Sequence, residues 1–490
     1  MIESVFPIRY STTREVNIRL SDIQGINYRI VVTLFFIVLA AVMSTRLISG
    51  AIEFTIPVMI VASIVLIIAT FVNTDIGLIA ILLSMLLSPE LEAGSAGGRE
   101  VVIRAEDLLL VIVSFTWLAK MAVKKIAPLK SSPLNIPIGV YIAVLFLSTA
   151  RGMIAGDVSV LKGMFFVLKL IEYYILFFMV LNQTTKVKQV KLFLVILLIT
   201  GIIVGIYGNA HIGDVERMSA PFEGTGEPNT LGGYLLFVLS IVGGLIFSYR
   251  KRRWILLLIF LFLAPVFMLT LSRASYLGMF ASLGAFVLVT RNKKVLGAVI
   301  LVVILFMLTV AFGPPVIKDR VLGAFQSEES QELKKVGIVT LGPSPAARVV
   351  SYKLILNRYF PQKPILGWGM TAGTFVDSQY FLVLKETGLI GLFLFFWIMW
   401  RLWRATLDSY RKVETPLFKG LALGYLIGFA GLLFHAIGSN SFIIIRIAEP
   451  FWFFGAIMVK LSDIETGKAV MEEELQKFGG SEWRLQQSRS

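Results

Sequence analysis

Residues 254–271 read WILLLIFLFLAPVFMLTL, a run that contains no charged side chain. A helix rises about 1.5 Å per residue, so a run of this length can cross a hydrocarbon core of about 30 Å. Similar apolar stretches occur on both sides of it along the chain. The expected spans are 30–43, 52–72, 76–88, 107–123, 136–150, 163–182, 191–209, 229–249, 254–271, 275–290, 295–312, 380–400, 417–436 and 441–460. The sequence therefore predicts an all-α polytopic membrane protein with about 14 transmembrane helices.

The composition supports this class. Of 490 residues, 57% are hydrophobic and 16% are charged, whereas soluble domains carry roughly 25% charged residues. A soluble enzyme is excluded. The chain has no cysteine and only two histidines, which excludes disulfides and thiolate sites and argues against a histidine-rich metal centre. We therefore expect no metal and no other cofactor.

The net charge of +15 is explained by membrane topology, because Lys and Arg gather in cytoplasmic loops. If the N-terminus is inside, alternate connections carry the basic clusters. These clusters are Lys124, Lys125 and Lys130; Lys186, Lys188 and Lys191; Arg250 to Arg253; Arg291, Lys293 and Lys294; and Arg401, Arg404, Arg411 and Lys412. We expect a protein of the cytoplasmic (inner) membrane with both termini inside, and no binding of nucleic acid.

Five segments follow from this map. The expected order is a cytoplasmic segment (1–29), transmembrane helices 1–11 (30–312), a large external loop (313–379), transmembrane helices 12–14 (380–460) and a cytoplasmic tail (461–490). The external loop is too polar for lipid, and apolar residues at helical spacing between Ala346 and Tyr359 predict a partly helical cap.

Three arginines are expected on the external side in separate segments. Arg217 lies in the loop 208–229, Arg273 in the junction LSRAS, and Arg348 in the large loop. A guanidinium donates two parallel hydrogen bonds and stays charged, which suits an anion such as a diphosphate. An ordinary ion pair or a contact with a lipid headgroup is the alternative for each arginine.

Other polar residues have weaker assignments. Lys169 and Glu172 lie three residues apart within one span and are expected to pair, and Arg446 and Glu449 repeat that spacing near an external end. Arg446 and His435 are candidate ligand-binding residues. A lone histidine is more often structural.

The stretch RVVSYKLILNRYFPQKPILGWGMTAGTFVDSQYFLVLKETGLIGLFLFF (348–396) resembles the signature region of the O-antigen ligase and polymerase superfamily. The matching elements are Arg348, the turn Pro364 to Gly369, the short motif Asp377 to Tyr380, and Glu386 to Gly391. The junction LSRAS and the loop RMSAPFEGTGEPN also resemble upstream elements of that family, so the resemblance covers roughly residues 205–400.

The resemblance implies a metal-independent glycosyltransferase that moves a polyprenyl-diphosphate-linked glycan to a glycan acceptor on the external face. It assigns Arg217, Arg273 and Arg348 to the diphosphate, and makes Tyr380 a candidate ligand-binding residue. A flippase and a chain-length regulator are implied as partners, besides membrane lipid.

One departure from the family concerns the base. Ligases usually have His–Asn where this chain has Asp377–Ser378, which favours a polymerase of O-antigen, capsule or exopolysaccharide. Asp377 is the expected catalytic base, with Glu223 as its competitor; capping of the following helix is the alternative role of Asp377. An O-antigen ligase, a protein O-oligosaccharyltransferase and, in another class, a glycolipid flippase or transporter remain open.

Overall fold

The computed structural model describes residues 67–71, 73–87, 90–96, 99–125, 130–213, 217–221, 227–312, 317–318 and 345–467. The spans expected at 30–43 and over most of 52–72 lie outside these residues, as do the segment 1–29, most of the large external loop before Pro345, and the tail beyond Gly467. The candidate base Glu223 also lies outside them.

The described chain is almost entirely helical, which confirms the all-α polytopic class. The helices before residue 313 are α3 (Thr74–Leu87), α4 (Ala105–Lys124), α5 (Asn135–Ile154), α6 (Val160–Gln183), α7 (Val187–Ala210), α8 (Pro228–Ser248), η2 (Arg250–Arg252), α9 (Arg253–Leu269), α10 (Arg273–Thr290) and α11 (Lys293–Phe312). Those after it are α13 (Pro345–Leu354), the π-helical turn η3 (Ile355–Tyr359), α14 (Phe360–Gln362), α15 (Gln379–Lys412), α16 (Pro416–His435) and α17 (Ile445–Glu465).

Within the described ranges, nine helices are long and apolar enough to cross a membrane. They are α5 to α11, with η2 counted into α9, together with α15 and α16. Helices α4 and α17 have 20 and 21 residues and coincide with two further expected spans, but several charged side chains interrupt them. The protein is thus an integral membrane protein; the expected number of 14 spans and the orientation of the termini remain predictions.

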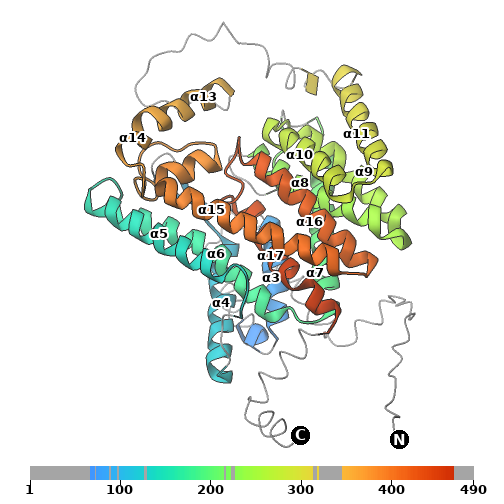
Figure 1. Cartoon of the computed structure of the whole chain (residues 1–490), viewed down its shortest axis with the longest axis horizontal. Coiled ribbons are helices and arrows are strands. Elements are labelled where there is room, and N and C mark those ends of the chain that lie inside the picture. Colours follow the sequence, from blue (N-terminus) through green and yellow to red (C-terminus); the bar gives the residue numbers. More distant parts are fainter. Residues whose placement is uncertain are drawn as a thin grey trace, which may run out of the picture.

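The centre of the bundle is formed by α8, α10, α16 and α17, which pack side by side (Figure 1). Helices α8 and α16 approach to backbone contact, since a Cβ placed on Gly244 would lie 2.3 Å from the Gly424 nitrogen. Small residues at such crossings let membrane helices pack closely without a hydrophobic driving force. The close crossing fixes the ends of both helices, and the candidate site lies at one of these ends.

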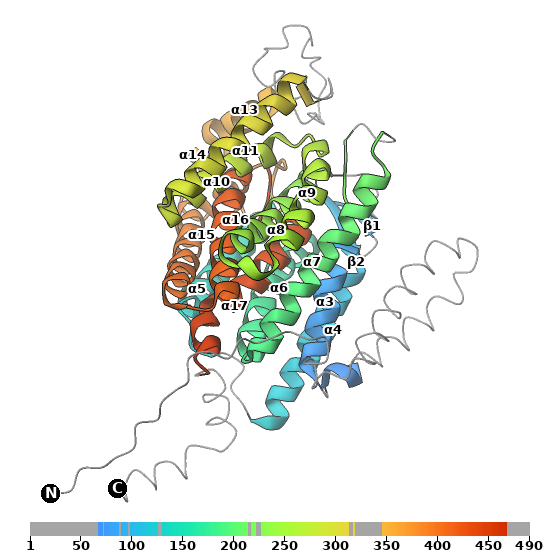
Figure 2. The same cartoon turned by 90° about the vertical axis from the view of Figure 1, so that its right-hand side faces the viewer.

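The helical cap expected between Ala346 and Tyr359 is present as α13 and η3. Together with α14 it lies at one end of the bundle, next to the N-terminal part of α15 (Figures 1 and 2). A short antiparallel hairpin, β1 (Glu90–Ala96) with β2 (Arg99–Arg104), connects α3 to α4. This hairpin was not predicted, because its segment contains no apolar run and only a short alternating pattern.

Candidate functional site

A break in α15 positions the family motif that follows the cap. Gly388 has φ 67° and ψ −164°, a backbone conformation that residues other than glycine essentially do not adopt. The break leaves backbone groups of α15 without helical partners. The turn 364–369 satisfies them: Trp368 and Gly369 donate to the Lys385 and Glu386 carbonyls at 2.9 Å each, and Leu389 and Ile390 donate to the Pro364 and Ile365 carbonyls at 2.9 and 3.3 Å.

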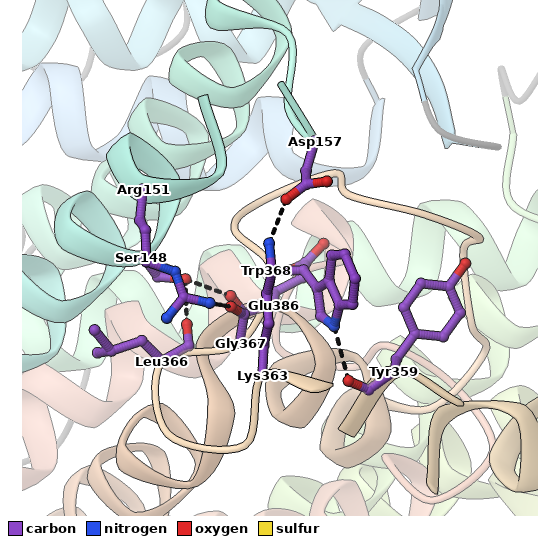
Figure 3. Close-up of polar contacts among 9 residues, drawn as sticks. All are labelled: Ser148, Arg151, Asp157, Tyr359, Lys363, Leu366, Gly367, Trp368 and Glu386. Carbon is purple, nitrogen blue, oxygen red and sulfur yellow. Dashed lines mark hydrogen bonds and ion pairs between the residues drawn. The ribbon is translucent and has the colours of Figure 1, made fainter. Parts of the chain in front are cut away.

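Helix α5 holds the other side of this turn (Figure 3). The Ser148 hydroxyl donates to the Glu386 carbonyl at 2.6 Å, and Arg151 donates to the Gly367 carbonyl at 2.7 Å. An ion pair between Lys363 and Asp157 adds a third attachment. We call residues 364–369 with Lys385–Ile390 the clamp. It anchors the loop 370–378, which carries Asp377.

Asp377 is half-buried at the end of this loop, directly before α15. Burial raises the pKa of its carboxyl, and the neighbouring Arg348 guanidinium opposes that shift without cancelling it. A carboxylate with a raised pKa is a stronger base than one in water. The N-cap position of α15 belongs to Ser378, whose side chain makes no capping hydrogen bond. The alternative role of Asp377, capping of this helix, is therefore wrong.

Arg348 and Tyr352 approach Asp377 from one face of α13, four residues apart. The Tyr352 hydroxyl donates to the Ile437 carbonyl at 2.7 Å and lies 3.4 Å from the Asp377 carbonyl. Its ring stacks on Phe381, with centroids 4.3 Å apart. Burial raises the pKa of the Tyr352 hydroxyl, so it stays protonated. Tyr352 thus fixes α13 over Asp377, a role that its position in an apolar pattern did not reveal.

The segments that carry Arg217 and Arg273 meet at the junction between α9 and α10. The Met218 amide donates to the Leu269 carbonyl at 2.9 Å, and the Arg217 guanidinium donates to the Leu271 carbonyl at 3.4 Å. Leu271 has a φ of 50°, which turns the chain sharply between the two helices. Arg273 is the first residue of α10. Two of the three expected arginine segments are therefore in direct contact.

The start of α8 joins the same junction. The Ser272 hydroxyl donates to the Asn229 side-chain carbonyl at 2.7 Å and accepts from the Ser275 amide at 3.2 Å, so Ser272 both links α8 to α10 and caps α10. His435 lies near the Asn229 backbone and the Arg348 guanidinium, and its Nδ1 lies 2.6 Å from the Ser441 hydroxyl.

The turn after α16 connects the two halves of the site. A Cβ placed on Gly438 would lie 3.3 Å from the Ala274 Cβ and 3.4 Å from Nη1 of Arg348. The same turn holds the Asp377 loop, since Asn440 donates to the Val376 carbonyl at 2.9 Å and the Gln379 amide donates to the Ala436 carbonyl at 3.0 Å. Segments carrying Arg273, Arg348 and Asp377 therefore meet around residues 435–441.

The remaining candidates have structural contacts. The Tyr380 hydroxyl donates to the Leu433 carbonyl, and the fully buried Arg446 donates to the Pro221 carbonyl at 3.3 Å. The other histidine of the chain, His211 at the end of α7, bonds to the Tyr207 carbonyl at 2.8 Å.

The ion pair expected within α6 is formed differently. Lys169 pairs at 2.6 Å with Asp107 of α4, so the ion pair links two helices. Glu172 and Glu449 lie near this pair and interact with it electrostatically. Spacing along the sequence predicts pairs only within one helix, so it could not predict Asp107 of α4 as the partner of Lys169.

The fold and the site define a polytopic membrane protein in which an arginine-rich, carboxylate-containing site lies at one end of the bundle. Residues 258–396 match the family model for O-antigen ligase. Among the described elements, the matched segment includes most of α9, all of α10, α11, α13, η3 and α14, and the first half of α15. The match supports the resemblance of this segment to the O-antigen ligase and polymerase superfamily. A comparison with curated proteins finds no match.

This match indicates an enzyme that resembles glycosyltransferases, a ligase or a polymerase, and that acts on lipid-linked glycans. Within the described residues, no group of three or more His, Asp and Glu side chains is arranged to hold a metal ion. Metal independence stays a prediction from the sequence.

Proposed function

We propose that the protein is a polysaccharide polymerase that transfers a polyprenyl-diphosphate-linked glycan to the end of an acceptor glycan on the external membrane face. The observation that supports it most is the meeting of the Arg273, Arg348 and Asp377 segments around one turn. Cations that stabilise a leaving diphosphate and a carboxylate that accepts a proton are the two requirements of this transfer.

The reaction balances with these groups alone. The acceptor hydroxyl attacks the anomeric carbon of the donor sugar and loses its proton to the Asp377 carboxylate. The bond from that carbon to the diphosphate oxygen breaks, and the lipid diphosphate leaves with an additional negative charge. Arg217 and Arg273, with Arg348 as a third cation, stabilise that charge. Fixed donors of this kind typically contribute about 3–4 kcal/mol each to the transition state.

Asp377 is favoured as the base on two grounds. Its raised pKa makes it a better proton acceptor than an exposed carboxylate, and Arg348 holds the ionised form available. The family's ligases usually have a histidine at this position, and an acid in its place favours polymerisation over ligation.

The test uses the full-length protein in proteoliposomes with a lipid-diphosphate oligosaccharide. Wild type should produce a ladder of products, each longer by one repeat. The Asp377→Asn variant should lose turnover by about 10²–10⁴-fold, the usual contribution of a general base. Full turnover in this variant would remove Asp377 from the mechanism and leave Glu223 to be tested. A single addition per acceptor would instead identify a ligase.

A further inference from the structure

A polar cavity lies at the opposite end of α15 from Asp377. It has a volume of about 420 Å³ and opens between the C-terminal parts of α15 and α17, beside Pro133. Ligand pockets usually measure about 300–1,000 Å³, so this one can hold a small polar group. The basic connections predict that this end faces the cytoplasm. We call it the α15–α17 cavity.

Charges of both signs line the cavity. Arg401, Arg404 and Lys412 contribute cations, and Asp408 and Asp463 contribute carboxylates. Asp408 is four residues from both Arg404 and Lys412, a spacing at which helical side chains usually pair. Yet in the part of the chain that the structure describes, none of these five side chains forms an ion pair. Cations and carboxylates are thus both available to a ligand.

The arginines are already oriented by their own contacts. Arg401 donates Nε to the Pro133 carbonyl at 3.1 Å, and the Arg404 guanidinium lies over the Trp400 ring, 5.4 Å from its centroid. Both contacts hold the guanidinium groups at the cavity and leave most of their N–H donors unused. Arginine forks of this kind match phosphate oxygens.

An apolar ridge runs along α15 toward this cavity. Phe393, Phe396 and Trp400 occupy one face of the helix, with 68%, 46% and 57% of their surface exposed. Arg404 continues the same face. The distance along the helix from Phe393 to Arg404 is about 16 Å, close to half of a hydrocarbon core of about 30 Å. This matches the length of an acyl chain in one leaflet, and tryptophan is typical of the headgroup boundary.

We propose that the α15–α17 cavity binds the headgroup of a zwitterionic aminophospholipid, of the phosphatidylethanolamine class, from the cytoplasmic leaflet. Its phosphate lies on Arg401 and Arg404, its ammonium on Asp408 and Asp463, and an acyl chain follows the ridge. The paired charges of the headgroup complement the unpaired charges of the cavity. A purely anionic headgroup would satisfy the arginines but leave the two carboxylates beside a negative group.

The test is native mass spectrometry of the delipidated full-length protein after addition of phosphatidylethanolamine, phosphatidylglycerol or soluble phosphoethanolamine. We expect phosphatidylethanolamine to be retained preferentially. Arg404→Ala should weaken its retention by about tenfold, as expected for the loss of charge-assisted hydrogen bonds. Asp408→Asn should abolish the preference over phosphatidylglycerol. Arg411→Ala is the matched control, because Arg411 is an exposed arginine of the same helix that does not line the cavity.

Three results would overturn the proposal. Equal retention of the two lipids, or an Asp408→Asn variant that keeps the preference, would mean that the carboxylates do not recognise the ammonium. Binding of phosphoethanolamine as tight as that of the lipid would mean that the ligand is a soluble compound. A second measurement is the fluorescence of Trp400 in a bilayer, which brominated phosphatidylethanolamine should quench. The Trp400→Phe variant corrects for the signal of the other tryptophans. This measurement does not depend on the Arg404 and Asp408 variants.

Discussion

Gly388→Ala tests whether the clamp positions the Asp377 loop. A Cβ at this position would lie 2.2 Å from the Ile365 carbonyl oxygen, and the φ of 67° is itself strained for alanine. The strain amounts to about 1–3 kcal/mol. Four hydrogen bonds join the turn to the break, each contributing about 0.5–1.5 kcal/mol net, so losing half of them adds a similar amount. The clamp should be weakened by about 2–6 kcal/mol.

Amide hydrogen exchange measures this weakening directly. A loss of about 2 kcal/mol in the opening free energy corresponds to exchange about thirtyfold faster, so the amides of Trp368, Gly369, Leu389 and Ile390 should accelerate at least that much in Gly388→Ala. Gly284→Ala is the control, since a Cβ there meets nothing within 4 Å. Unchanged protection of the four amides in Gly388→Ala would contradict this prediction, because the turn would then not depend on the break.

Two predictions concern the charged groups. Arg273→Ala should lower glycan transfer by about 10²–10³-fold, the usual effect of removing one fixed donor, while Arg250→Ala at the predicted cytoplasmic end should leave it unchanged; equal effects would exclude a local role. Arg348→Gln removes the group that lowers the pKa of Asp377, so that pKa should rise further and the acid limb of the pH–rate profile should move to higher pH. An acid limb at the same pH in this variant would show that Asp377 is not the titrating base.

The helices were predictable because lipid imposes a simple rule. Every expected span from 76–88 onward coincides with a described helix, since an apolar run in a membrane can satisfy its backbone only by forming one. This rule does not predict where a helix ends or breaks outside the lipid. Helix α15 was expected to end at residue 400 and continues to Lys412, and its break at Gly388 left no trace in the hydrophobic pattern.

The candidate site was predictable only in part. The types of residue in the site could be predicted, because three arginines are expected on the external side and arginine suits an anion. Their neighbours were not, because contacts such as Ser272 with Asn229, or Gly438 between Ala274 and Arg348, join residues far apart in sequence. Tyr352 lies in a segment with apolar residues at helical spacing, and only its contact with the Asp377 carbonyl shows that it lies beside Asp377.

The release of polyprenyl diphosphate by the purified protein distinguishes glycan transfer from transport. With a lipid-linked oligosaccharide as both donor and acceptor, the proposed reaction predicts one free lipid diphosphate for each new glycosidic bond. Movement of intact glycolipid across the bilayer, with neither diphosphate released nor bonds formed, would contradict it and identify a transporter.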